Sequence, residues 1–153
     1  MTVNDMSYST SVHVAASPQQ VYDTVRQLER MGEWSPENTG GTWLTGDGSS
    51  VGDQFEGVNR VGDREWSAVA SVNQATPGEV FAFFTGPAED PLVQWTYRMA
   101  SDEGGTTITE EWDVIKLPPT LAKAPPEALV ARKAAVQKGM ETTLDAIKAS
   151  IEN

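Results

Sequence analysis

Tyr97 and Glu110 are the two residues of this sequence whose types and positions best suit chemistry. They flank the turn-forming segment 101–105, so antiparallel pairing of the strands on either side would place them opposite each other. In a dry interior, loss of hydration would raise the carboxyl pKa and make Glu110 a candidate acid or base, with Tyr97 as its hydrogen-bond partner. The alternatives are a purely structural Tyr–Glu hydrogen bond and a Glu110 side chain that reaches water at a rim.

Residue types argue against most other catalytic or metal-binding arrangements. The chain has a single histidine, His13, and no cysteine, so neither a thiolate nucleophile nor a His/Cys metal site is expected. His13 alternates with Val12 and Val14, which places it on the opposite strand face, and no serine is placed beside it for a triad. The glycine-rich segments 40–43 and 46–52 match neither a Walker nor a dinucleotide motif. We therefore predict no metal and no cofactor.

Length and charge limit the domain organisation and the partners. The 153 residues suit one domain, 1–153. With 22 acidic and 11 basic residues, the net charge of −11 disfavours nucleic acid and anionic lipid surfaces. The polar start, 1–5, lacks the apolar run of a signal peptide, and no stretch approaches the ~20 apolar residues of a membrane span. We expect a cytoplasmic protein, a monomer or weak homodimer, without stable membrane insertion.

The positions of turns and apolar residues predict an α+β protein. Period-two alternation predicts a strand over 7–14, and Ser17-Pro18 is a typical helix start, with that helical region ending near Met31-Gly32. Six further strands are expected at 42–44, 54–61, 64–74, 80–85, 92–100 and 106–114. The segment Leu117–Pro126 contains four prolines and is predicted to be neither strand nor helix interior. A long apolar-striped helix is predicted from Pro126 to about Ile151.

Short turns fix which strand residues share a face. A two-residue turn at Gly62-Asp63 pairs Asn59 with Trp66 and Phe55 with Ala70, and the turn at 76–79 pairs Val72 with Phe83. The last hairpin places Trp95 opposite Trp112 and Tyr97 opposite Glu110. With Trp34 from a loop and Val136 and Met140 from the helix, the predicted ligand-binding set is Trp34, Phe55, Asn59, Trp66, Phe81, Phe83, Trp95, Tyr97, Glu110, Trp112, Val136 and Met140.

From the residues alone, this face could line either a solid core or a cavity. Aromatic residues at period two usually pack against one another in a core. However, Gly57, Ala68 and Ala70 are small, and the polar Asn59 and Glu110 would be costly in a dry core without partners. Asn59 could orient a ligand carbonyl, or it could have the structural role of fixing the end of a strand.

Several short motifs resemble a known family. The run Val12–Pro18 followed by Val21-Tyr22 resembles the opening of the polyketide cyclase/dehydrase branch of the START-related (SRPBCC) superfamily. Within that branch, the sequence looks like an actinobacterial member. Further matching motifs lie at 33–36, 41–43, 51–59, 95–97 and 104–112. The resemblance covers nearly the whole chain and preserves the order of elements.

The resemblance implies a helix-grip fold: a curved antiparallel sheet of about seven strands around a long C-terminal helix, with two short helices after the first strand. It also implies a cavity between sheet and helix, and so favours the cavity over the solid core. Members of this superfamily include lipid and sterol carriers, hormone receptors and polyketide aromatase/cyclases, and the fold does not select among them.

Three functional hypotheses follow. The first is binding or carriage of a small hydrophobic ligand, lipid or polyketide-like. The second is a polyketide cyclase or dehydratase that uses Glu110 and Tyr97 for proton transfer. The third is a regulatory partner protein with a vestigial cavity. Two segments are candidate gates of the cavity: the Trp34 loop, which otherwise anchors itself to the core, and Leu117–Pro126, which is otherwise a connector.

Overall fold

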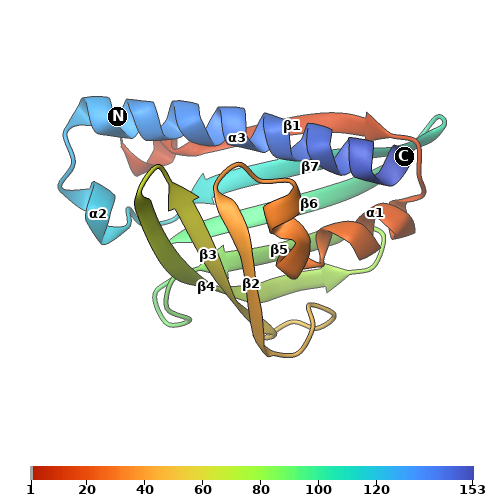
Figure 1. Cartoon of the computed structure of the whole chain (residues 1–153), viewed down its shortest axis with the longest axis horizontal. Helices are drawn as coiled ribbons and strands as arrows, with labels where there is room; N and C mark the ends of the chain where they lie inside the picture. Colours follow the sequence, from red (N-terminus) through yellow and green to blue (C-terminus); the bar gives the residue numbers. More distant parts are fainter. Residues whose placement is uncertain (1) are drawn as a thin grey trace.

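The computed structural model describes residues 2–153 and shows one curved antiparallel sheet of seven strands along which a long helix lies (Figure 1). The strand order is β1-β7-β6-β5-β4-β3-β2. The strand bounds are β1 Ser7–Val14, β2 Asn38–Thr45, β3 Gln54–Val61, β4 Arg64–Thr76, β5 Val80–Thr85, β6 Val93–Asp102 and β7 Gly105–Val114. The predicted helix-grip α+β fold is confirmed.

The strand registers predicted for the β3/β4, β4/β5 and β6/β7 hairpins are confirmed. Trp66 pairs with Asn59, and Ala70 pairs with Phe55. The turn at 76–79 is closed by a hydrogen bond from Glu79 N to Thr76 O, and Gly78 has a φ of +74°, a left-handed value that glycine adopts without strain. Beyond this turn, Val72 pairs with Phe83 despite a β-bulge between residues 72 and 74. The inner face therefore carries the residues that the turns predicted.

Two short helices follow β1, as expected. Helix α1 spans Pro18–Val25, and the Ser17 side chain caps it by accepting a hydrogen bond from the backbone of Gln20. The helical region then changes to a 3-10 helix, η2, over Leu28–Glu33. A further 3-10 turn, η1, covers Val3–Asp5, where no element was predicted.

Two segments differ from the prediction. Strand β2 is longer than the predicted 42–44, because the chain at Gly40 and Gly41 pairs with β3 through irregular steps that a residue pattern does not reveal. The proline-rich segment was predicted to be neither strand nor helix interior, yet it contains one helical turn, α2, at Pro119–Ala122. Pro119 stands in the first turn, where the missing N–H costs nothing.

The long helix α3 spans Pro126–Glu152, close to the predicted range. It packs mainly against β1 and makes fewer contacts with β7, while η2 packs against β2 at the other end of the sheet. In Figure 1, α3 lies along β1 and β7, and the tip of the hairpin of β3 and β4 points toward the helix. The core accordingly divides into two clusters, one around Leu144, Ile147 and α1, and one around Trp112, Val136 and Met140.

Candidate functional site

The predicted site residues on the sheet come together on its concave side. Phe81 pairs with Tyr97 and Phe83 with Trp95, which continues the inner face from β5 to β6. Trp95 and Trp112 are direct cross-strand neighbours, as are Tyr97 and Glu110. The opposite face is polar, and there the exposed Arg98 forms an ion pair of 2.8 Å with Glu111. The sheet thus has one aromatic face and one face suited to water.

Glu110 is a buried carboxyl in this aromatic face. Tyr97 Oη donates a hydrogen bond of 3.0 Å to Glu110 Oε2, and both side chains are nearly inaccessible to solvent, at 2% for Tyr97 and 3% for Glu110. Glu110 Oε1 is buried and has no hydrogen-bond partner. A buried polar atom without a partner is uncommon in folded proteins and calls for an explanation.

Burial changes the protonation of this pair. Loss of hydration raises the pKa of Glu110 from 4.5 to about 8, although the Tyr97 hydrogen bond opposes the shift. Burial, the charge of Glu110 and their hydrogen bond raise the pKa of Tyr97 well above its usual value. At neutral pH Glu110 is therefore mainly an uncharged carboxylic acid.

In the described range 2–153, two further buried side-chain groups have no hydrogen-bond partner. They are the hydroxyl of Tyr22 on α1 and the indole N–H of Trp34, which follows η2. Tyr22, Trp34 and Tyr97 belong to the same core cluster. Arg30 lies over the Trp34 ring, 4.9 Å from its centroid, and this cation–π contact holds the ring at the loop. The predicted loop residue Trp34 is thus an anchored core residue.

The other predicted residues differ in burial. Phe55, Phe81, Trp112, Val136 and Met140 are buried. In contrast, Asn59, Trp66, Phe83 and Trp95 remain half-buried although they share the concave face.

Two of the half-buried residues have identifiable polar neighbours. Asn59 Oδ1 accepts a weak hydrogen bond of 3.4 Å from Asn38 Nδ2, and the Arg64 guanidinium lies 5.0 Å from the centroid of the Trp66 ring. These contacts leave Asn59 on β3 and the Trp66 ring on β4 only half-buried at the β3–β4 end of this face.

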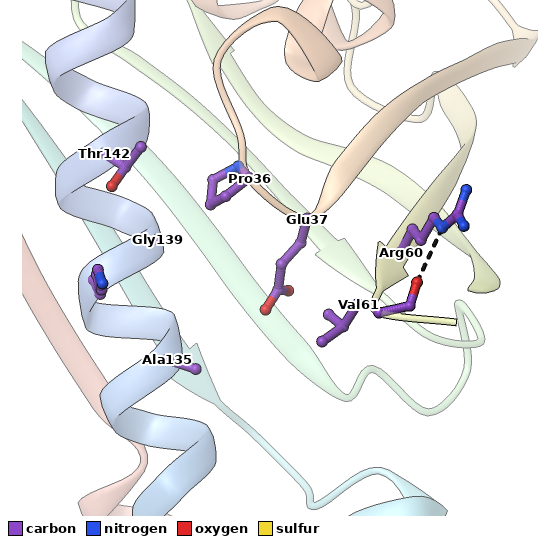
Figure 2. A pocket seen from close by; sticks show the side chains of 9 residues that line it. Pro36, Glu37, Arg60, Val61, Ala135, Gly139 and Thr142 are labelled. Carbon is purple, nitrogen blue, oxygen red and sulfur yellow. Dashed lines mark hydrogen bonds between the residues drawn. The ribbon is translucent and has the colours of Figure 1, made fainter. Parts of the chain in front are cut away.

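A pocket of about 360 Å³ opens between the loop after η2, the end of β3 and the middle of α3. It is lined by Pro36, Glu37, Arg60, Val61, Gly62, Ala135, Lys138, Gly139 and Thr142. Figure 2 shows Pro36 and Glu37 turned toward α3, whereas Arg60 points away from the helix and donates to the carbonyl oxygen of Gly62.

An ion pair spans the region beside this pocket. The Arg132 guanidinium on α3 donates two hydrogen bonds to Glu37, Nη1 to Oε1 at 2.7 Å and Nη2 to Oε2 at 3.1 Å. The two side chains are 30% and 25% exposed, so the pair is only partly screened by water. It ties the loop that carries Pro36 to the helix.

None of the predicted ligand-binding residues lines this pocket. Val136 and Met140 face the core, and the pocket is bordered by the neighbouring stripe of α3 that includes Ala135 and Gly139. The sequence signal for this stripe was Gly139, because glycine within a helix is destabilising and calls for a reason. The predicted role of the inner-face residues in ligand binding stays a prediction.

Two classes of site are not found within residues 2–153. No group of three or more histidine or acidic side chains is arranged to hold a metal ion there. In the same range, no helix combines the length and hydropathy needed to cross a bilayer.

Comparisons with known proteins agree with this architecture. Residues 5–152 match the family model described as polyketide cyclase / dehydrase and lipid transport. No functionally curated protein matches the sequence. Among solved structures, the Polyketide_cyc-like protein Cgl2372 from Corynebacterium glutamicum is 31% identical over 94% of this chain and 89% of that chain, with a TM-score of 0.66.

More distant structures share the fold. Protein CV1439 from Chromobacterium violaceum is 15% identical, with a TM-score of 0.70 over 96% of this chain and 98% of that chain. The di-domain ARO/CYC protein StfQ from the steffimycin biosynthetic pathway is 11% identical, with a TM-score of 0.76 over 96% of this chain and 50% of that chain.

Proposed function

Because this chain belongs to the polyketide cyclase / dehydrase and lipid transport family, we propose that it binds a small hydrophobic ligand, lipid or polyketide-like, between the concave face of the sheet and α3. The ligand enters beside Gly139 and Pro36 and lies against the aromatic inner face. The protein acts as a carrier or binder.

The observation that carries the proposal is the half-buried state of Trp66, Phe83 and Trp95. These rings share a face with fully buried residues, and in a solid core α3 would cover them as well. Large rings left partly uncovered are typical of small-molecule sites. An apolar ligand that covered these rings would gain the hydrophobic free energy that the fold leaves unused.

Tryptophan fluorescence tests the proposal. Fatty acids, sterols and aromatic polyketides are titrated into the protein, and at least one class is expected to shift the emission saturably, because Trp66 and Trp95 line the site. A Gly139→Leu variant should weaken that binding. A Cβ added at this position would lie 3.7 Å from Pro36 Cγ, and the longer leucine side chain would enter the pocket. Ala149→Leu, on the exposed end of the same helix, is the matched control. Equal affinity in both variants, or no shift with any class, would refute the proposal.

Catalysis is the second candidate, and the contact between Tyr97 and Glu110 favours it. A carboxyl with a pKa of about 8 can both give and accept a proton near neutral pH, as enolate chemistry in a cyclisation or dehydration requires. Glu110→Gln keeps the shape but not the ionisable group. Turnover of a bound poly-keto substrate by the wild type that Glu110→Gln abolishes would favour the enzyme; binding without turnover in both favours the carrier.

A further inference from the structure

Within residues 2–153, three buried side-chain atoms have no hydrogen-bond partner. They are Tyr22 Oη, Trp34 Nε1 and Glu110 Oε1. The first two carry a hydrogen to donate, and Glu110 Oε1 does so when the carboxyl is protonated. The residues are 3%, 4% and 3% exposed, so bulk water does not satisfy these groups. An indole N–H can only donate, and a phenol O–H donates readily.

The hydrogen bond between Tyr97 and Glu110 determines which carboxyl oxygen carries the hydrogen when Glu110 is protonated. Tyr97 donates to Oε2, which is therefore the accepting oxygen of the acid. In the protonated acid the hydrogen then lies on Oε1, the oxygen without a partner. Oε1 is accordingly a donor that faces no protein acceptor.

The interior offers nothing to neutralise an anion. Within residues 2–153 the buried polar and charged side chains are Ser71, Thr96, Thr106, Glu110 and Thr143, which include no lysine or arginine. The cations that line the pocket, Arg60 and Lys138, are exposed at its opening, and Arg132 beside it is already held by Glu37. A carboxylate or phosphate carried inside would remain an unpaired buried charge.

The groups around Glu110 keep this environment uncharged. Its partner on β6 is Tyr97, and its neighbour on β1 is Thr10. On α3 the buried side chains are apolar apart from Thr143. The acidic Glu141 and Asp145 of α3 are exposed and line, with Thr10, a separate pocket of about 240 Å³.

The other charged groups on neighbouring elements are not buried with Glu110. Arg98 on β6 and Glu111 on β7 form an ion pair on the far face of the sheet, and Asp23 of α1 is exposed.

We infer that the ligand is uncharged and rich in hydrogen-bond acceptors where it enters the interior, and that Glu110 selects it by donating from Oε1 to a carbonyl oxygen. This inference rests on the proposed function and narrows its ligand class. Trp34 and Tyr22 supply further donors for the same kind of molecule. The site therefore prefers a ketone to the matching hydrocarbon or carboxylate.

The test compares matched molecules. Two series are used: 9-fluorenone, fluorene and fluorene-9-carboxylate, and 2-tridecanone, tridecane and tridecanoate. Binding to the full chain is followed by tryptophan fluorescence at pH 6 and pH 9. At pH 6 the ketone of a series that binds is expected to bind roughly five- to tenfold more tightly than its hydrocarbon, the effect of one net hydrogen bond, and more tightly than its carboxylate. At pH 9 the preference should shrink, because Glu110 has then lost its proton.

Three variants locate the effect. Glu110→Gln keeps a donor at this position, so its ketone preference should persist and no longer change with pH. Glu110→Met removes the donor and should bind ketone and hydrocarbon equally. Glu111→Gln, on the far face, should behave as the wild type.

The outcomes separate the two proposals. Equal binding of ketone and hydrocarbon by the wild type, or a ketone preference that survives in Glu110→Met, overturns the inference and leaves hydrophobic binding standing. If hydrocarbons bind and the relative affinity for ketone does not change between pH 6 and pH 9, water alone satisfies Glu110 Oε1. That result also overturns the inference. No binding of any member of either series by the wild type overturns the proposed function and the inference together.

Discussion

Replacing Glu110 by glutamine should change how the stability of the protein depends on pH. Burial raises the pKa of Glu110 from 4.5 to about 8 in the folded chain. In the unfolded chain the carboxyl is hydrated and titrates near its ordinary value. Between pH 4.5 and pH 8 the folded chain therefore holds a proton that the unfolded chain has released, so a rise in pH favours unfolding.

The size of the effect follows from the same two values. The stabilising contribution of the protonated carboxyl is complete below pH 4.5, falls as pH rises toward 8, and levels off above that. The difference between the two pKa values corresponds to roughly 5 kcal/mol across this range. A domain of this size has a net stability of about 5–15 kcal/mol, so the wild type should be markedly less stable at pH 9 than at pH 5. The Tyr97 phenol does not titrate in this range, because its pKa lies well above 10.

Denaturant unfolding at intervals from pH 5 to pH 9 measures the effect. The free energy of unfolding of Glu110→Gln minus that of the wild type is expected to rise by several kcal/mol over this range, since glutamine does not titrate. Taking the difference removes the contribution of all other titrating groups. Glu111→Gln is the control: it loses only a partly exposed ion pair with Arg98, worth less than about 1 kcal/mol. Parallel curves for the wild type and Glu110→Gln would show that Glu110 ionises in the folded state, and the reasoning would fail.

Four further outcomes are expected. Gly139→Ala should stabilise the protein by about 0.5–1 kcal/mol in thermal or denaturant unfolding, because the added methyl makes only an ordinary van der Waals contact, 3.7 Å from Pro36 Cγ, and alanine favours the helix; a loss of stability would contradict the open pocket. Tyr22→Phe should change stability by less than about 0.5 kcal/mol, since its hydroxyl has no partner, whereas Tyr97→Phe should cost about 1–3 kcal/mol by leaving Glu110 Oε2 unpaired; equal costs would be inconsistent with this assignment. Arg132→Gln should cost at most about 1 kcal/mol, but should speed ligand exchange in stopped-flow fluorescence by freeing the Glu37 loop; unchanged exchange would show that this loop is no gate. Dialysis against a chelator should leave the melting temperature unchanged, and a drop of several degrees would reveal a bound cation.

The strands and their registers could be predicted because local chemistry determines them. The turns at Gly62 and Gly78 are short, so each fixes which residues face each other, and the alternation of side chains then assigns the faces. The pairing of Tyr97 with Glu110 followed in the same way from the hairpin at 101–105. Their hydrogen bond needed only two side chains of suitable length on one face.

The pocket could not be predicted from these rules. Its walls come from the loop after η2, the end of β3 and one flank of α3, which are distant in sequence and meet only through tertiary packing. The orientation of α3 decides whether Gly139 or Met140 faces the opening, and one residue corresponds to about 100° of rotation. The apolar stripe contains the buried Met140, whose predicted place in a ligand cavity stays a prediction, and it carried no information about which flank of α3 stays uncovered. Strand β2 was underestimated because Gly40 and Gly41 look like turn residues in a sequence.

The pairing of β1 with β7 has a consequence for folding. Ser7 lies opposite Asp113, so the first strand finds its sheet partner only after most of the chain has been synthesised. The strands β2 to β7 pair with their sequence neighbours and can form as local hairpins during synthesis. Strand β1 and then α3 close the structure last, and until then the edge of β7 is open to pairing with another nascent chain. Substitutions that weaken the packing of α3 on β1 should therefore lower the yield of folded protein more than they lower its final stability.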